Sequence, residues 1–386
     1  MDHLRPATDK TDGVIMNLEE FKKFAAEDPS LISLKEQVLD RRSEVRESLY
    51  EKPDLRHLFF ELTLKCNERC FHCGSGCEPG QITGLPLKKY AEILDEVDKN
   101  FDKKRIQICI TGGEPMIRSD FFDIMNMIND KGFAWGMTSN ATLITKEAAH
   151  KLRLAGMKTI SVSIDGLEET HDAQRGLKGG YAMAMRGIQN LIDEGGFHHI
   201  QITTVVNHKN ITELDELFEI VKGIDVGSWR VIGIEPIGRA LNFPDMLLTP
   251  EDQRRLFSFI LEKRRAGYPV EYGCSHFLGT DIEGNVRKRM FLCNAGVFTA
   301  SIRSDGSITG CLDIMPNAET IFGNVNEDSF TDVWNNRFET FRKHLSERNK
   351  DCMECEYEKW CAGGAHHSFD YANNKPLICF KDVLFT

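Results

Sequence analysis

The chain has 386 residues, of which 41% are hydrophobic and 28% charged, and its formal net charge is −11 at pH 7. The length predicts two or three domains, and the composition is typical of a globular protein. The acidic excess argues against nucleic acid as the main partner, because phosphate contacts need clustered Lys and Arg. It weakly favours a neutral or basic substrate.

Targeting signals are not evident in the sequence. The start, Met1 to Pro6, has no apolar core of a secretory signal, and no run of about eighteen apolar residues follows. We therefore expect a cytoplasmic protein with no membrane partner. The chain has twelve Cys, and without an export signal so many Cys predict metal ligation rather than disulfides.

Residues 1–54 are polar and helix-prone, and Leu31 to Tyr50 carries apolar residues near helical spacing. This predicts a helical N-terminal extension over 1–54. From about residue 56, short apolar segments alternate with amphipathic ones. Strands are predicted at His57–Leu64, Arg105–Ile110, Ala134–Thr138, Thr159–Ile164, His199–Val206 and Trp229–Gly233. Helices are predicted near Leu87–Asn100, Asp120–Asp130, Thr145–Leu154, Tyr181–Glu194, Ile211–Val221 and Pro250–Arg265.

Six strand–helix repeats imply an α/β domain over 55–270, with parallel strands joined by right-handed crossovers. Six units are too few to close an eight-unit barrel. The helix expected at Pro250 has a good start signal, since proline suits the first helical position. The alternation fades from about Cys274, and seven Cys follow from there to the end. We expect residues 271–386 to form a Cys-rich domain that needs metal to fold.

Cys66, Cys70 and Cys73 form a C-x3-C-x2-C run. A [4Fe–4S] cluster normally takes four thiolates, so three on one loop would leave one iron open to a small molecule. Zinc is less favoured, because zinc sites usually combine C-x2-C pairs into four ligands. Disulfides belong to oxidising compartments, and chance spacing remains an alternative in a chain so rich in Cys.

The C-x3-C-x2-C spacing resembles the signature of the radical S-adenosylmethionine (radical SAM) superfamily. The resemblance implies a partial (β/α)6 TIM-like barrel whose open iron chelates the amino and carboxylate groups of SAM. It also implies that one electron, from a partner such as flavodoxin or ferredoxin, cleaves SAM to methionine and a 5′-deoxyadenosyl radical.

The segment after the second strand, Gly112-Gly113-Glu114-Pro115, resembles the motif that binds the SAM amino group in this family. Paired glycines let backbone approach a ligand closely. An ordinary Gly-Gly turn is the alternative. The resemblance further implies SAM contacts at the ends of later strands, at Ser139, Asn140, Ser161, Ser163, Asp165, Arg175 and Ile234. Arg175 would pair with the SAM carboxylate, which suits a guanidinium; taken singly, the others are routine polar strand ends.

The later Cys residues resemble the SPASM domain, with Cys293-x12-Gly306-x4-Cys311 and then Cys352-x2-Cys355-x5-Cys361 before Cys379. The resemblance implies a small α+β domain with two auxiliary [4Fe–4S] clusters; a zinc ribbon is the alternative. The distal cluster would use Cys352, Cys355, Cys361 and Cys379, and the proximal cluster Cys274, Cys293 and Cys311. The family's fourth proximal Cys is replaced by Ala365. That iron is either open or bound by another ligand such as His366 or His367, unless these His only pack.

Two side chains are candidate catalytic residues. Cys77 lies four residues after the cluster loop and could donate a hydrogen atom, as in epimerases of this class, or be an unreactive loop Cys. Asp313 lies two residues after Cys311, whereas the base of sulfatase-maturating relatives directly follows the equivalent Cys; here Leu312 holds that place.

The resemblance implies an oxidoreductase that abstracts hydrogen from a substrate. Most SPASM members modify ribosomally made peptides or proteins, by crosslinking, oxidation or epimerisation. A small molecule such as a sugar or porphyrin is the alternative substrate. A non-catalytic iron–sulfur electron carrier is less favoured, because a carrier needs neither the Gly-Gly motif nor Arg175.

Overall fold

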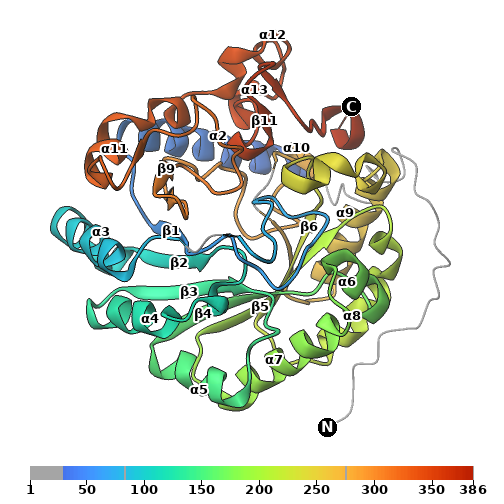
Figure 1. The fold of residues 1–386 in the computed structure, drawn as a ribbon. Helices are drawn as coiled ribbons and strands as arrows, with labels where there is room; N and C mark the ends of the chain where they lie inside the picture. The colour runs from blue at the N-terminus through green and yellow to red at the C-terminus, as the bar shows by residue number, and fades with distance from the viewer. Residues whose placement is uncertain (1–28, 82–83, 274–275, 386) are drawn as a thin grey trace.

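The computed structural model describes residues 29–81, 84–273 and 276–385. Its centre is a curved ten-stranded sheet in the order β10-β9-β8-β1-β2-β3-β4-β5-β6-β7 (Figure 1). The strands are β1 (His57–Glu61), β2 (Gln107–Thr111), β3 (Ala134–Ser139), β4 (Met157–Ser163), β5 (His199–Val206), β6 (Ser228–Gly233), β7 (Val270–Tyr272), β8 (Thr299–Ile302), β9 (Ser307–Thr309) and β10 (Gly323–Asn324). A separate hairpin pairs β11 (Phe369–Asp370) with β12 (Lys375–Pro376).

Helices cover the convex face of this sheet, as Figure 1 shows. The helices before the C-terminal region are α2 (Pro29–Glu51), α3 (Leu87–Asn100), α4 (Phe121–Asp130), α5 (Lys146–Leu154), α6 (Glu168–Arg175), α7 (Gly180–Glu194), α8 (Leu214–Lys222) and α9 (Pro250–Arg265). Shorter helices follow, namely α10 (Gly279–Ile282), α11 (Phe330–Asn336), α12 (Lys350–Met353) and α13 (Glu358–Cys361). The predicted partial barrel of six strand–helix units followed by a small Cys-rich α+β region is confirmed.

Strand side chains alternate between the two faces of the sheet. Leu58 and Phe60 on β1, and Ile108 and Ile110 on β2, are fully or almost fully buried in the core beneath the helices. The opposite face is polar, since Gln107 on β2 donates a hydrogen bond to the Thr159 hydroxyl on β4 at 3.0 Å. The main apolar core therefore lies outside the barrel, which leaves its interior free for a ligand.

The predicted start of α9 is confirmed by its capping geometry. The Thr249 hydroxyl accepts a hydrogen bond from the Asp252 amide, and the Asp252 carboxylate accepts one from the Thr249 amide. Pro250 occupies the first turn, where its missing N–H costs nothing.

The C-terminal region joins the barrel sheet directly. β8 pairs in parallel with β1, with Leu58 opposite Ala300, and β7 pairs in parallel with β6. The predicted domain boundary at 270/271 falls within β7, and it stays a prediction. Strands of three or four residues are too short to show periodicity in a sequence. Among the described residues β7 pairs only with β6, so the barrel stays open on that side.

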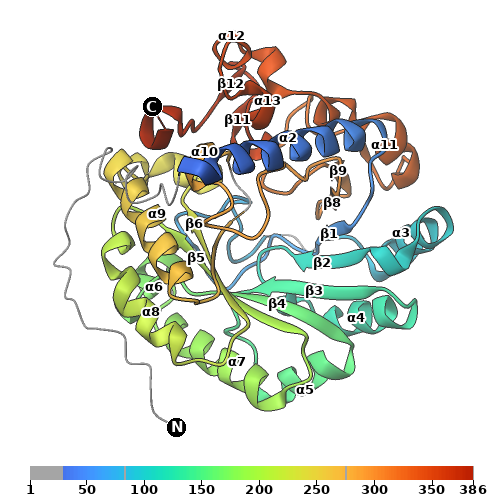
Figure 2. The same ribbon diagram turned by 180° about the vertical axis from the view of Figure 1, so that it is seen from behind.

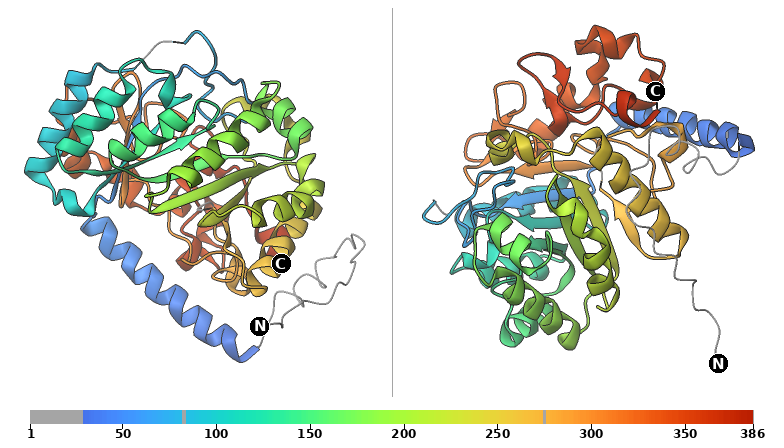
Figure 3. Two further views of the ribbon diagram at one scale, coloured as in Figure 1. Left: turned by 90° about the horizontal axis from the view of Figure 1, so that it is seen from below. Right: turned by 90° about the vertical axis from the view of Figure 1, so that its right-hand side faces the viewer.

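The helix α2 lies along the C-terminal region, as Figures 2 and 3 show. Leu39 packs in an apolar cluster that includes Phe277 and Trp360. The buried Arg46 guanidinium donates to the carbonyls of Lys359 at 2.9 Å and Trp360 at 3.1 Å. Within the predicted helical extension over 1–54, α2 thus braces the Cys-rich region, while residues 1–28 lie outside the described residues. No helix among the described residues is both long and apolar enough to cross a membrane.

These contacts predict a stability effect. Replacing Arg46 by Ala should lower the free energy of unfolding by about 1.5–3 kcal/mol, because the buried Trp360 carbonyl and the partly buried Lys359 carbonyl lose a charged donor. Arg41→Ala on the same helix is the control, since Arg41 forms only an exposed pair with Glu44, worth at most about 1 kcal/mol. Chemical denaturation of both variants under anaerobic conditions measures the difference. Equal losses would contradict a bracing role for Arg46.

Candidate functional site

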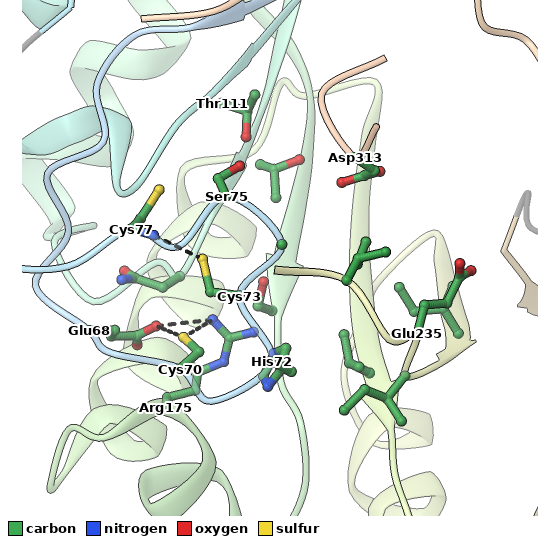
Figure 4. A pocket seen from close by; sticks show the side chains of 18 of the residues that line it. Glu68, Cys70, His72, Cys73, Ser75, Cys77, Thr111, Arg175, Glu235 and Asp313 are labelled. Carbon is green, nitrogen blue, oxygen red and sulfur yellow. Dashed lines mark hydrogen bonds and ion pairs between the residues drawn. The ribbon is translucent and has the colours of Figure 1, made fainter. Parts of the chain in front are cut away.

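A cavity of about 350 Å³ opens at the carboxyl ends of the barrel strands, where ligands bind in β/α proteins. Figure 4 shows its two walls. The loop that carries Cys70, Cys73 and Cys77 forms one wall, and Glu235 and Asp313 lie on the other.

The cluster loop presents Cys66, Cys70 and Cys73 to this cavity. The Cys66 and Cys70 side chains are buried, while Cys73 is partly exposed. The loop stays close to the end of β2 because Gly113 lies against it: a Cβ at Gly113 would lie 2.1 Å from the Lys65 carbonyl oxygen. All three Cys residues therefore border one cavity, and their role as cluster ligands stays a prediction.

Arg175 supports this loop from inside the barrel. Its guanidinium pairs with Glu68 at 3.0 Å and with Asp165 at 2.6 Å, and it lies 3.9 Å from the Cys70 sulfur. His72 also contacts Asp165, at 3.2 Å. Burial opposes ionisation of Asp165, but the adjacent Arg175 and His72 hold the pKa of its carboxyl below the usual value. Two residues of the cluster loop are therefore connected to the buried Asp165 carboxylate, His72 directly and Glu68 through Arg175.

Arg239 supports the loop from the other side. Its guanidinium donates to the carbonyls of Cys70 at 2.8 Å, Gly76 at 3.2 Å and Cys77 at 2.6 Å. The neighbouring Gly238 has a φ of +54°, and a Cβ there would lie 2.3 Å from the Gly74 carbonyl oxygen. Glycine at 238 is therefore needed to bring Arg239 against the loop.

The Gly-Gly segment lines the cavity beside Cys66. Amide groups of Gly113 and Glu114 donate to Thr63 and Lys65 of the cluster loop, at 2.6 and 3.0 Å. No donor of the described residues bonds to the carbonyls of Gly112 and Gly113, so both can accept from a ligand ammonium.

Glu114 lies beneath this segment. Its carboxylate accepts from the Ser139 hydroxyl at 3.0 Å and the Asn140 amide at 2.9 Å, and burial raises its pKa to about 7. Glu114 therefore holds Ser139 and Asn140, which line the cavity, and is itself buried, as is Pro115.

The predicted contacts on later strands divide into two groups. Ser163, Arg175 and Ile234 line the cavity. Ser161 instead shares a hydrogen bond of 2.6 Å with Thr203, and Asp165 is fully buried among its own partners. A SAM contact by any of these residues stays a prediction. Because Asp165 is fully buried, it would influence SAM through its partners Arg175 and His72.

The cavity residues fit the expected cofactors. The Glu68 Oε1 and His72 Nδ1 atoms are buried without a protein partner, although both side chains line the cavity; buried polar atoms normally have one. No three His, Cys, Asp or Glu side chains of the described chain converge closely enough to hold a single metal ion. A [4Fe–4S] cluster places its irons and sulfides between the thiolates, so it does not need such convergence.

Cys77 lies beside the cluster ligands. Its side chain is buried, and its backbone amide donates to the Cys73 sulfur at 3.3 Å. A hydrogen bond from the Cys77 thiol lowers the pKa of Cys73 to about 6 and raises that of Cys77. Cys73 is therefore the thiol that most readily becomes the metal-binding thiolate. A role for Cys77 as hydrogen-atom donor stays a prediction.

The structure brings the predicted distal thiols together. Burial, together with the nearby Cys379, Cys352 and Cys355, raises the pKa of Cys361 to about 12. Cys293 and Cys311 of the proximal set are partly buried. Cys274 lies outside the described residues. Asp313 lines the cavity, with its carboxylate 3.9 Å from the Cys311 sulfur.

Ala365 is buried in the apolar cluster that holds Trp360. The adjacent His366 is buried with its Nδ1 atom 2.6 Å from the Tyr371 hydroxyl, and burial lowers its pKa to about 3. The His367 Nε2 atom lies 3.2 Å from Glu235. Both rings thus have protein partners, and a cluster-ligand role for either stays a prediction.

Three cavity residues were missed by the sequence reasoning, namely Glu68, Arg230 and Glu235, as was Arg239, which supports the cluster loop from outside the cavity lining. Arg230 did carry a signal, because it is a charged residue inside an otherwise apolar strand. Glu235 and Arg239 follow a strand at the ligand-binding edge, but their partners lie far away in the sequence.

Comparison with known proteins agrees with this geometry. The family profile of the radical SAM superfamily matches residues 60–221, and that of the SPASM iron–sulfur cluster-binding domain matches residues 293–356. An AdoMet-dependent heme synthase of Methanosarcina barkeri is 28% identical over 352 residues, which cover 84% of this chain and 97% of that protein. The mycofactocin maturase MftC of Mycolicibacterium smegmatis is 30% identical over 313 residues, which cover 80% of this chain and 77% of that protein.

A solved structure described as native anSMEcpe with bound AdoMet and Cp18Cys peptide superposes with a TM-score of 0.65. It is 20% identical, and the match covers 82% of this chain and 90% of that one. At this identity the likeness shows the fold alone. The family profiles and the similarity to MftC show that this chain belongs to the radical SAM superfamily and carries a SPASM domain, and is thus an enzyme whose cofactors are SAM and iron–sulfur clusters.

Proposed function

We propose that this enzyme is a maturase that abstracts a hydrogen atom from a ribosomally made peptide or protein. The observation that carries the proposal is the cavity bordered by Cys66, Cys70 and Cys73 on one wall and by a residue of the SPASM region, Asp313, on the other. The maturase relative supports a peptide substrate.

When bound, the cluster and SAM supply a carbon-centred radical that removes hydrogen from substrate. The chain's own part is binding and positioning. The carbonyls of Gly112 and Gly113 accept from the SAM ammonium, and Arg175 with Arg239 fixes the thiolate loop. The SPASM thiols, such as Cys352, Cys355 and Cys361, would hold auxiliary clusters that could bind substrate or take up an electron from it. A flavodoxin or ferredoxin would supply the electron that starts SAM cleavage.

A small-molecule substrate of the porphyrin type is the second candidate. It is favoured by the heme synthase relative, because the match covers 97% of that protein. Deuterium transfer distinguishes the candidates. Deuterated peptide or deuterated porphyrin is supplied to the reduced holoenzyme with SAM, and the label is sought in 5′-deoxyadenosine by mass spectrometry. If 5′-deoxyadenosine acquires deuterium from the porphyrin and not from the peptide, the maturase proposal is wrong.

The first prediction concerns the thiolate loop. Anaerobically reconstituted enzyme should hold about twelve irons, and the Cys66/Cys70/Cys73 triple Ala variant should lose about four of them. SAM cleavage should also disappear, because no open iron remains. Iron analysis and chromatography of 5′-deoxyadenosine measure both. Cleavage retained by the triple variant would contradict the assignment.

A second prediction concerns Arg175. Its replacement by Ala should weaken SAM binding by about 1.5–3 kcal/mol, because a charge-assisted partner is lost. Equilibrium dialysis with the cluster-loaded protein measures the affinity. Arg186→Ala is the control, since Arg186 is exposed on α7. If iron content falls while the remaining loaded protein binds SAM normally, Arg175 serves only to hold Glu68 and the loop.

A further inference from the structure

The ionic side chains that line the cavity are mostly matched within the protein. Glu68 pairs with Arg175, and Glu235 pairs with His276 at 3.3 Å and His367 at 3.2 Å. Two charges remain without an ion pair among the described residues. Asp313 is exposed at one wall, and Arg230 lies on the interior face of β6.

The Arg230 guanidinium is held in place by neutral groups. Its Nε atom donates to the Thr203 hydroxyl at 3.2 Å, and its Nη2 atom lies 3.5 Å from the Ser161 hydroxyl. Ser161 and Thr203 are themselves hydrogen-bonded at 2.6 Å. These contacts come from the two adjacent strands β5 and β4, and they orient the guanidinium without neutralising it.

The carboxylate that lies in register with Arg230 forms an ion pair with another residue. Glu271 on β7 lies opposite Arg230, but it pairs with Lys288 at 2.9 Å. Arg230 is only partly exposed. A partly buried charge without a counter-ion is unfavourable, and an incoming anion would relieve that cost. The planar guanidinium binds carboxylates through two parallel hydrogen bonds.

We propose that Arg230, oriented by Ser161 and Thr203, is the subsite that binds a carboxylate group of the substrate inside the barrel. This inference rests on the proposed function, because it assumes that substrate enters the cavity beside SAM. The carboxylate belongs either to a peptide, at its C-terminus or a side chain, or to a small organic acid. We expect the SAM carboxylate at Arg175 on α6, so the carboxylate proposed at Arg230 is that of the substrate.

Matched probes test the inference on holoenzyme saturated with SAM. The peptide arm compares N-acetyl-Gly-Tyr with the same dipeptide amidated at its C-terminus. The small-molecule arm compares 3-phenylpropionate with 3-phenylpropionamide. Saturation-transfer NMR measures each affinity, and line broadening on cluster reduction reports whether the probe lies near the loop. At least one acid should bind about tenfold tighter than its amide, which is about 1.4 kcal/mol.

Arg230→Gln should abolish that preference, while Arg255→Gln, at an exposed position on α9, should keep it. The arm that shows the preference identifies the source of the carboxylate. Equal binding of acid and amide by the unmodified enzyme would overturn the inference without any variant. A preference that survives in Arg230→Gln would overturn it too. Weaker SAM binding by this variant would instead assign Arg230 to SAM. In each of these cases SAM cleavage by the unmodified enzyme would leave the proposed function intact.

Discussion

The site depends on how one short loop is held against the barrel. The cluster loop has little regular structure of its own, and its three thiolates must point to one space. Two arginines provide this constraint from opposite sides. Arg175 reaches it through Glu68 from inside the barrel, and Arg239 binds three of its carbonyls from the segment after β6. Buried charged hydrogen bonds are costly to break, because the partner left behind stays desolvated.

The same segment after β6 connects the loop to the SPASM region. Glu235 contacts His276 and His367, which belong to the C-terminal part of the chain. Arg239 follows Glu235 by only four positions along the chain. The thiolate loop, the barrel wall and the SPASM region therefore share one set of contacts. The parallel pairing of β8 with β1 and the packing of α2 on the C-terminal region join the same parts by other routes.

The position of the apolar core explains why a cavity can exist here at all. The buried side chains lie between sheet and helices, so the concave face is free to carry polar groups. Inside the barrel, a single guanidinium without an ion pair attracts an anion strongly, since little solvent screens its charge.

The sequence by itself determined the local features of this protein. Short segments of the chain specify the thiol spacing, the Gly-Gly-Glu-Pro segment and the alternation of β-strands and α-helices. The bounds of β5, α3 and α9 agree with the predicted ranges residue for residue. Short-range periodicity and turn chemistry are sufficient for such features, because their causes lie within one or two turns of chain.

Only the tertiary structure decided which distant residues serve the site. Arg175 and Glu68 are 107 residues apart, and Arg239 and Cys77 are 162 apart. The short strands β7 and β8 form because they pair with the edges of β6 and β1, and not because their three or four residues favour an extended conformation. Arg230 shows the same limit: its sequence marks it as an unusual strand residue, but only the fold shows that no described carboxylate pairs with it. Pairing of charges depends on positions in space, which local sequence does not specify.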